Sequence, residues 1–139
     1  MNQQEKTIVV AWLLVIATAS VACGTNDTAT LTELQRLTSG NLDVVLLSSR
    51  EAIRHGKDTF FIEFRSTPGN LVDVGMVRGN ATMPMPGMPM FGSLEVKRTD
   101  VTGRYEAQSD FGMAGTWRMT IQWDGSAGQG SVTFSGTVQ

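Results

Sequence analysis

The chain has one cysteine, one histidine and one tyrosine among its 139 residues, and these scarcities exclude several kinds of protein. A single cysteine cannot support an internal disulfide framework. No HExxH, GxSxG or phosphate-cradling glycine motif is present, so the sequence predicts no enzymatic activity. The 11 Lys and Arg residues are outnumbered by 13 Asp and Glu, and they form no basic run. Nucleic acid is therefore not an expected partner.

Long hydrophobic runs are also scarce. The one such run, residues 7–22, is shorter than the roughly 20 residues that a bilayer-spanning helix needs. It follows a polar start that includes Lys6, so residues 1–22 are predicted to be a secretory signal peptide. Residues 20–23 (SVAC) resemble a bacterial lipobox, which predicts that Cys23 becomes the lipidated N-terminus of a membrane-anchored, extracytoplasmic protein of the periplasm or cell envelope. The alternatives are an uncleaved membrane anchor, or cleavage nearby that leaves a free thiol.

Proline occurs only four times, and three of the four fall within residues 81–91, ATMPMPGMPMF. Four of the eight methionines lie in the same stretch: Met83, Met85, Met88 and Met90. Because proline fixes φ and lacks an amide hydrogen, this segment is predicted to be a stiff, extended loop. Its thioethers are soft ligands that suit Cu(I). Methionine is also an adaptable hydrophobe on binding surfaces, so a hydrophobic docking loop is the alternative.

From residue 41 onward, apolar residues recur at every second position and turn residues separate the runs. Strands are predicted at residues 41–48, 58–65, 71–78, 93–98, 104–109, 116–123 and 131–138. This pattern predicts an all-β fold, an immunoglobulin-like antiparallel β-sandwich of about seven strands over residues 41–139. Trp117 and Trp123 alternate with polar residues and are expected in its core. Residues 23–40 are predicted to be the lipidated cysteine and a flexible tether, with residues 31–39 as a short helical turn or further linker.

Strand direction predicts which connections share one end of the sandwich. If consecutive strands are antiparallel, the connections after the first, third and fifth predicted strands lie together. These connections carry His55, the methionine-rich loop and Met113. Six side chains are therefore candidate metal ligands at one pole: Met83, Met85, Met88, Met90, Met113 and His55. Met76 and Met119 are expected to pack inward beneath that pole.

Four segments carry a resemblance to a known family: residues 72–75 (VDVG), 81–90 (ATMPMPGMPM), 103–105 (GRY) and 111–117 (FGMAGTW). Together with the last glycine-rich turn and strand, they resemble the YtkA-like/FixH-like family over roughly residues 42–138. The resemblance implies a small extracytoplasmic β-sandwich, often a lipoprotein or part of a heavy-metal efflux system. It also implies an association with copper handling and oxidase assembly, and it points to the five methionines of the pole as the positions to test.

Two functions follow as hypotheses. The first is a lipid-anchored module that carries or buffers Cu(I) through three of the five methionines, with His55 as an optional further ligand. The second is a metal-free interaction module whose loop docks on a membrane complex, such as an efflux adaptor or oxidase-assembly machinery.

The lipobox resemblance of residues 20–23 generates a direct prediction. Cys23→Ala should abolish partitioning of the protein into the detergent phase, because the acylated thiol is then absent. Equal mature masses and equal release into the soluble fraction for Cys23→Ala and the parent would refute lipidation.

Overall fold

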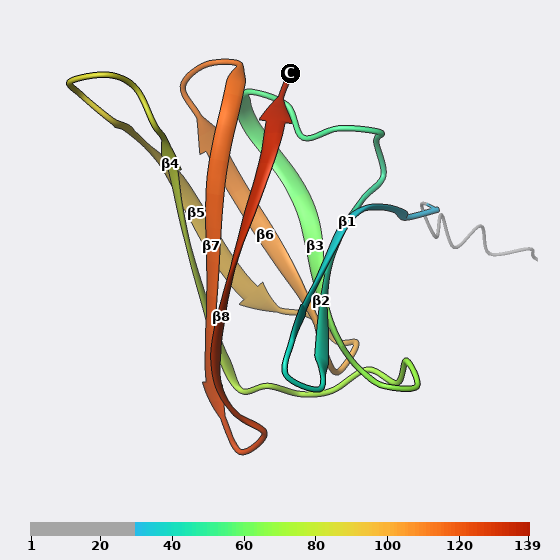
Figure 1. Cartoon of the computed structure of the whole chain (residues 1–139). Coiled ribbons are helices and arrows are strands. Elements are labelled where there is room, and N and C mark those ends of the chain that lie inside the picture. The colour runs from blue at the N-terminus through green and yellow to red at the C-terminus, as the bar shows by residue number, and fades with distance from the viewer. Residues whose placement is uncertain (1–29) are drawn as a thin grey trace, which may run out of the picture.

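The computed structural model describes residues 30–139, so the predicted signal segment 1–22 and Cys23 lie outside the described residues. Within these described residues, eight strands follow one another (Figure 1). They are β1 (Thr32–Ser39), β2 (Leu42–Ser48), β3 (Gly56–Ser66), β4 (Met76–Met83), β5 (Met90–Arg98), β6 (Arg104–Phe111), β7 (Gly115–Gly125) and β8 (Gly128–Val138). Within residues 30–139 no helix is long and apolar enough to cross a membrane. The predicted all-β class is confirmed.

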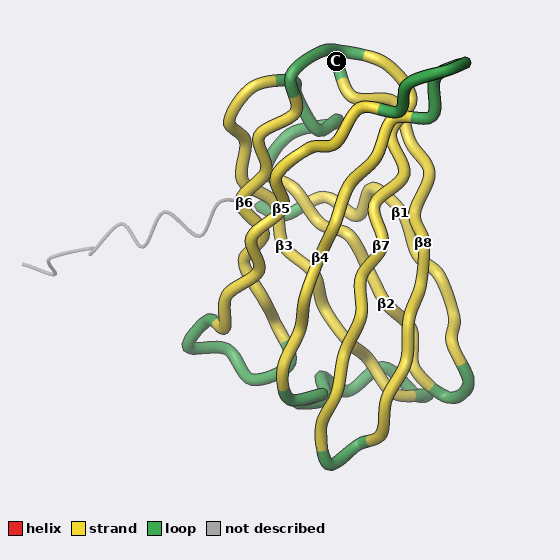
Figure 2. Tube along the Cα trace, turned by 90° about the vertical axis from the view of Figure 1, so that its left-hand side faces the viewer, coloured by secondary structure: helices red, strands yellow, loops and turns green. Residues whose placement is uncertain are grey.

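The strands form one antiparallel sheet in the order β1-β2-β3-β6-β5-β4-β7-β8, folded into two layers. The layers join at β5, because residues 90–92 pair with β4 whereas residues 93–98 pair with β6. In Figure 2, β4, β7 and β8 run side by side as one layer. At the far edges of the sheet, β1 and β8 are in contact. The immunoglobulin-like sandwich architecture is therefore confirmed.

The core lies between the two layers and follows the predicted alternation. Phe60, Ile62 and Phe64 of β3 are fully buried, and Phe64 meets Trp123 of β7 with ring centroids 5.2 Å apart. Trp117 is also fully buried and stacks on Phe111, with centroids 4.8 Å apart. Both tryptophans were expected in the core, and this expectation is confirmed.

The prediction of a flexible tether over residues 23–40 is wrong for the last part of that range, because residues 32–39 form β1. This strand pairs antiparallel with β2 through a turn at Gly40, whose φ of 62° is a conformation that glycine adopts without a steric penalty. A register shift between Glu33 and Gln35 inserts Leu34 as an extra residue. Because of this bulge, Leu34 and Leu37 both pack against the core. A spacing of three residues is also typical of one face of a helix, which is why the sequence suggested a helical turn here. Over residues 30–139 the sandwich therefore has eight strands rather than about seven.

The strand predicted at residues 71–78 is also displaced. β4 begins only at Met76, which is 58% exposed and lies at the end of the sandwich away from the methionine-rich loop. The expectation that Met76 packs beneath that loop is wrong, whereas Met119 is buried as expected. Hydrogen bonds from Arg98, with N–O distances of 2.8 and 3.0 Å, help to hold Asp73 in the preceding connection. These bonds lower the pKa of the Asp73 carboxyl below its ordinary value.

The buried aromatic stack supports a stability prediction. Trp117→Ala should lower the free energy of unfolding by roughly 3–5 kcal/mol, the range for truncating a buried aromatic side chain. A denaturant titration followed by circular dichroism measures this. A midpoint that barely moves would show that the Trp117 ring contributes little to the core.

Candidate metal centre

Three connections meet at one end of the sandwich: residues 49–55, 84–89 and 112–114 (Figure 1). The C-terminal residue Gln139 lies there too, since its amide donates to the carbonyl of Ile53 over 2.9 Å. We call this end the Met pole. Strand direction alone predicted that these connections would be neighbours, and the topology places them together.

Met83 and Met90 form the base of the methionine-rich loop. They are directly opposite one another where β4 pairs with β5, so their side chains leave the same face of the sheet. Met83 is buried and Met90 is half-buried. Both thioethers lie against the turn between β6 and β7. A Cβ atom placed on Gly115 would be 2.7 Å from Met83 Cε, and one on Gly112 would be 3.6 Å from Met90 Cε.

Met113 lies in that same turn and is 42% exposed. The buried Trp117 side chain holds this turn in place, because its Nε1 donates a hydrogen bond of 3.0 Å to the Met113 carbonyl. The Phe111 and Trp117 rings stack beneath the base of the loop, where a Cβ atom on Gly92 would be 2.6 Å from Phe111 Cδ1. Met83, Met90 and the turn bearing Met113 therefore converge above an aromatic floor.

Met85 and Met88 occupy the tip of the loop and are 44% and 77% exposed. The prolines at positions 84, 86 and 89 restrict the backbone around them, as the sequence predicted. The five methionines thus form two groups. The base group consists of Met83 and Met90, which pack against the domain, and Met113, which is 42% exposed in the turn that they contact. The tip group, Met85 and Met88, extends into solvent.

His55 is exposed at the end of the first connection of the Met pole. Its Nδ1 lies 3.0 Å from the carbonyl oxygen of Gln139, which can only accept, so Nδ1 carries the proton. This tautomer leaves Nε2 with a free lone pair, the arrangement found in histidines that bind metals. Its neighbour Gly56 pairs with Phe111, which places His55 beside the β6–β7 turn.

No three His, Cys, Asp or Glu side chains gather to hold a metal ion within residues 30–139. The candidate ligands at the Met pole are thioethers, which belong to a different ligand class. Cys23, the predicted lipidation site, lies outside the described residues.

Phe91, which lies outside the strands predicted from the sequence, is 77% exposed beside the base of the loop. It follows Met90 in β5, and strand alternation turns it to the opposite face of the sheet from the core. The alternation was available in the sequence, but the predicted strand began only at residue 93 and so omitted this residue.

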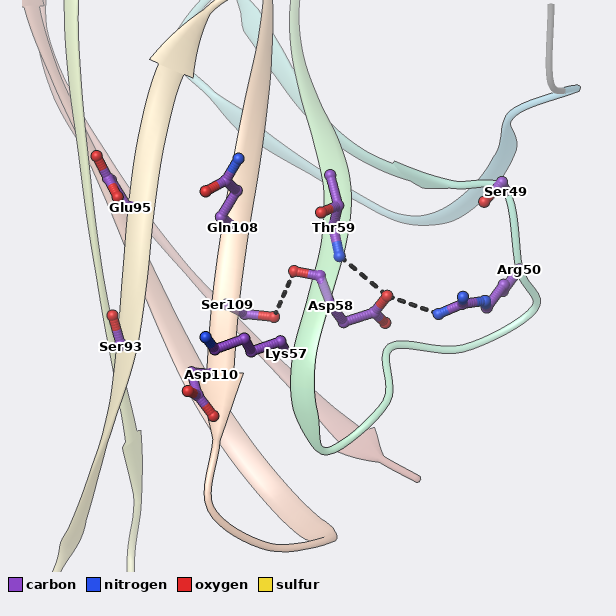
Figure 3. A pocket seen from close by; sticks show the side chains of 10 residues that line it. All are labelled: Ser49, Arg50, Lys57, Asp58, Thr59, Ser93, Glu95, Gln108, Ser109 and Asp110. Carbon is purple, nitrogen blue, oxygen red and sulfur yellow. Dashed lines mark hydrogen bonds and ion pairs between the residues drawn. The ribbon is translucent and has the colours of Figure 1, made fainter. Parts of the chain in front are cut away.

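A polar groove of about 560 Å³ lies on the outer face of β3, β6 and β5, apart from the methionines (Figure 3). Its buried carboxylate, Asp58, accepts hydrogen bonds from Arg50 at 2.7 Å and from the backbone amides of Arg54 and Thr59 at 2.8 and 2.9 Å. Asp58 is thereby occupied in fixing the 49–55 connection. No methionine lines the groove.

Comparison with solved structures confirms the fold class. The crystal structure of the Lin-41 filamin domain superimposes with a TM-score of 0.50 at 14% sequence identity, covering 76% of this chain and 98% of that one. At this identity the likeness concerns the fold alone. The chain is thus a filamin-like, immunoglobulin-type β-domain with methionines gathered at one pole.

A family model described as YtkA-like matches residues 36–122, which is more than half of the chain. The protein belongs to the YtkA-like family. No curated protein sequence matches the chain. Neither the family nor the filamin-like fold is of an enzymatic kind.

The contact between Gly115 and Met83 generates a prediction about the site. Gly115 has φ of 144°, so Gly115→Ala should cost more than about 1 kcal/mol of unfolding free energy and displace the Met83 methyl group. Gly112→Ala is the matched control, because its Cβ would make an ordinary 3.6 Å contact with Met90. Chemical shifts of the methionine methyl groups measure the displacement. An unchanged Met83 signal in Gly115→Ala would contradict the described packing.

Proposed function

We propose that the protein is an extracytoplasmic Cu(I)-binding module that carries or buffers the ion at the Met pole. The observation that supports this function best is the pairing of Met83 with Met90 against the turn that contains Met113. Thioethers are among the few protein ligands that select Cu(I), and they need no deprotonation before binding. A copper ion is the cargo of this domain rather than a resident cofactor.

The two methionine groups suit two stages of metal handling. Met83 and Met90 lie against the β6–β7 turn that carries Met113, and this base group provides the holding site. Met85 and Met88 are exposed on a stiff loop and are accessible to a donor or acceptor protein. Because methionine has three rotatable side-chain bonds, a ligand from the tip can replace one from the base during transfer. His55 Nε2 is available as a further ligand beside the turn.

The same proposal assigns no catalytic role to the domain. The sequence contains no catalytic motif, and its single histidine interacts with the backbone carbonyl of Gln139.

A second candidate, a metal-free docking module, is favoured by one observation: Met85, Met88, Phe91 and Met113 are all exposed at the Met pole. That arrangement suits a membrane complex such as an efflux adaptor or oxidase-assembly protein.

Competitive Cu(I) titration of the full chain against a chromophoric chelator, under anaerobic conditions, separates the two functions. Met83→Leu/Met90→Leu should lower the Cu(I) affinity by at least about 10- to 100-fold, since even outer-shell partners of a metal contribute that much. Leucine conserves volume and hydrophobicity, so the unfolding free energy should change by less than about 1.5 kcal/mol per site.

Met76→Leu is the matched control, because Met76 lies at the opposite end of the sandwich and should not affect the affinity. Met85→Leu/Met88→Leu should weaken binding less than the change at the base. A parent chain that binds Cu(I) no tighter than micromolar would exclude the copper function and favour the docking module. If Met83→Leu/Met90→Leu and Met76→Leu lower the Cu(I) affinity equally, the base group is excluded as the holding site.

The pH dependence of binding gives a further prediction. A thioether has no proton to lose, so Cu(I) affinity should remain nearly constant between about pH 5 and 8. An imidazole must be neutral to bind, so His55→Ala should remove any modest loss in acid and retain most of the affinity. Affinities measured by the same titration at several pH values test this. A steep loss for the parent on acidification would show that protonatable groups dominate the site.

A further inference from the structure

The methionines of the domain differ widely in their access to solvent. Met88 is 77% exposed at the tip of the loop between β4 and β5, and this loop projects away from the sandwich (Figures 1 and 2). A Cβ atom on the neighbouring Gly87 would meet nothing within 4 Å, so the space around the tip is open. Met83 and Met119, in contrast, are only 7% and 3% exposed. A small oxidant dissolved in water therefore reaches Met88 more readily than it reaches these buried sulfurs.

Hydrogen bonding to sulfur is a second property that separates the methionines. Met76 is 58% exposed, which is more than Met85 or Met113. However, Met76 Sδ accepts a hydrogen bond of 3.1 Å from Arg78 Nη2, and this bond engages a lone pair of the sulfur. Within residues 30–139, Met76 is the one methionine whose sulfur accepts a hydrogen bond. Met88 therefore combines the largest exposure with unengaged lone pairs.

The reaction that depends on both properties is two-electron oxidation of the thioether. A sulfur lone pair attacks the terminal oxygen of a hydroperoxide, so that an S–O bond forms while the O–O bond breaks. The sulfur is oxidised to a sulfoxide, and the peroxide is reduced to water or an alcohol, which takes up the proton of the transferred oxygen. The sulfoxide is polar, and methionine sulfoxide reductases return it to the thioether.

We propose that Met88 is a site of reversible oxidation by hydroperoxides, and that its sulfoxide slows the transfer of Cu(I). The second part rests on the proposed copper function. A sulfoxide presents a hard oxygen where the thioether presents a soft sulfur, and a soft donor is what Cu(I) selects. Met83 keeps its thioether because it is buried, so the base group still holds the ion. Oxidation at the tip thereby separates holding the ion from transferring it.

The first experiment follows oxidation of the copper-free full chain by hydrogen peroxide. The methionine methyl groups are isotope-labelled and assigned with single Met→Leu variants, and NMR spectra recorded over time give a rate for each sulfur. Met88 should react first, and Met83 and Met119 last. Met76 should react several-fold more slowly than Met88, whereas their exposures of 58% and 77% alone would predict similar rates.

The hydrogen bond to Met76 provides a control within the same spectra. Arg78→Gln should release the Met76 sulfur and bring its rate close to that of Met88. Arg118→Gln is the matched control, because Arg118 is exposed on β7, the strand beside β4, and should not alter the Met76 rate. Equal rates for Met76 and Met88 in the parent chain would overturn the proposal, since oxidation would then be unselective surface damage. Oxidation of Met83 as early as Met88 would also overturn it.

The second experiment measures how fast Cu(I) passes from the chain to a chromophoric chelator under anaerobic conditions. The chain oxidised only at Met88, and then freed of peroxide, should transfer the ion several-fold more slowly than the parent, with a smaller change in equilibrium affinity. Methionine sulfoxide reductase should restore the parent rate. Met88→Leu should already transfer slowly and should not respond to the same dose of peroxide.

The two experiments fail in distinguishable ways. An unchanged transfer rate after oxidation of Met88 would overturn the second part of the proposal while the chain still binds Cu(I). A chain that binds no Cu(I) would refute both the copper function and this second part. The oxidation rates are measured without copper, so they decide the Met88 site separately.

Discussion

The change of partner along β5 is the constraint on which the rest of the structure depends. At Gly92 the strand leaves β4 and joins β6, and a side chain there would collide with the Phe111 and Trp117 rings below. This crossing joins the two layers of the sandwich. It also limits β4–β5 pairing to three positions, the last of which sets Met83 opposite Met90. The bend that closes the fold therefore also places two thioethers side by side at its end.

The Met pole combines rigid and adaptable parts. Its floor is a stacked aromatic pair, and the indole of Trp117 holds the carbonyl of Met113 in place. The groups above this floor are methionines, whose side chains can rearrange without large changes in packing energy. This division suits the cargo site that we propose, because the fold fixes where the sulfurs gather while the side chains keep the freedom that metal exchange requires.

Much of the fold and part of the site could be predicted from the sequence. Alternation identified the inward face of β3 and β7, and antiparallel order placed His55, the loop and Met113 at one end. The β1 strand was missed because a bulge at Leu34 breaks the alternation. The start of β4 was misplaced because residues 71–75 form only an isolated bridge, between Leu71 and Arg65, before Gly75 turns the chain with a φ of 84°. The hydrogen bonds of Asp73 help to hold this connection in place. Nothing in the sequence distinguishes the buried Met83 from the exposed Met88, since that difference arises from strand pairing across the loop.

The central claim is that thioethers of the Met pole hold Cu(I). X-ray absorption spectroscopy of the copper-loaded full chain at neutral pH tests it most directly, because the fine structure above the copper edge distinguishes sulfur from nitrogen or oxygen neighbours. The account predicts a nearest shell dominated by sulfur, with at most one nitrogen from His55. A shell dominated by nitrogen or oxygen atoms would contradict it.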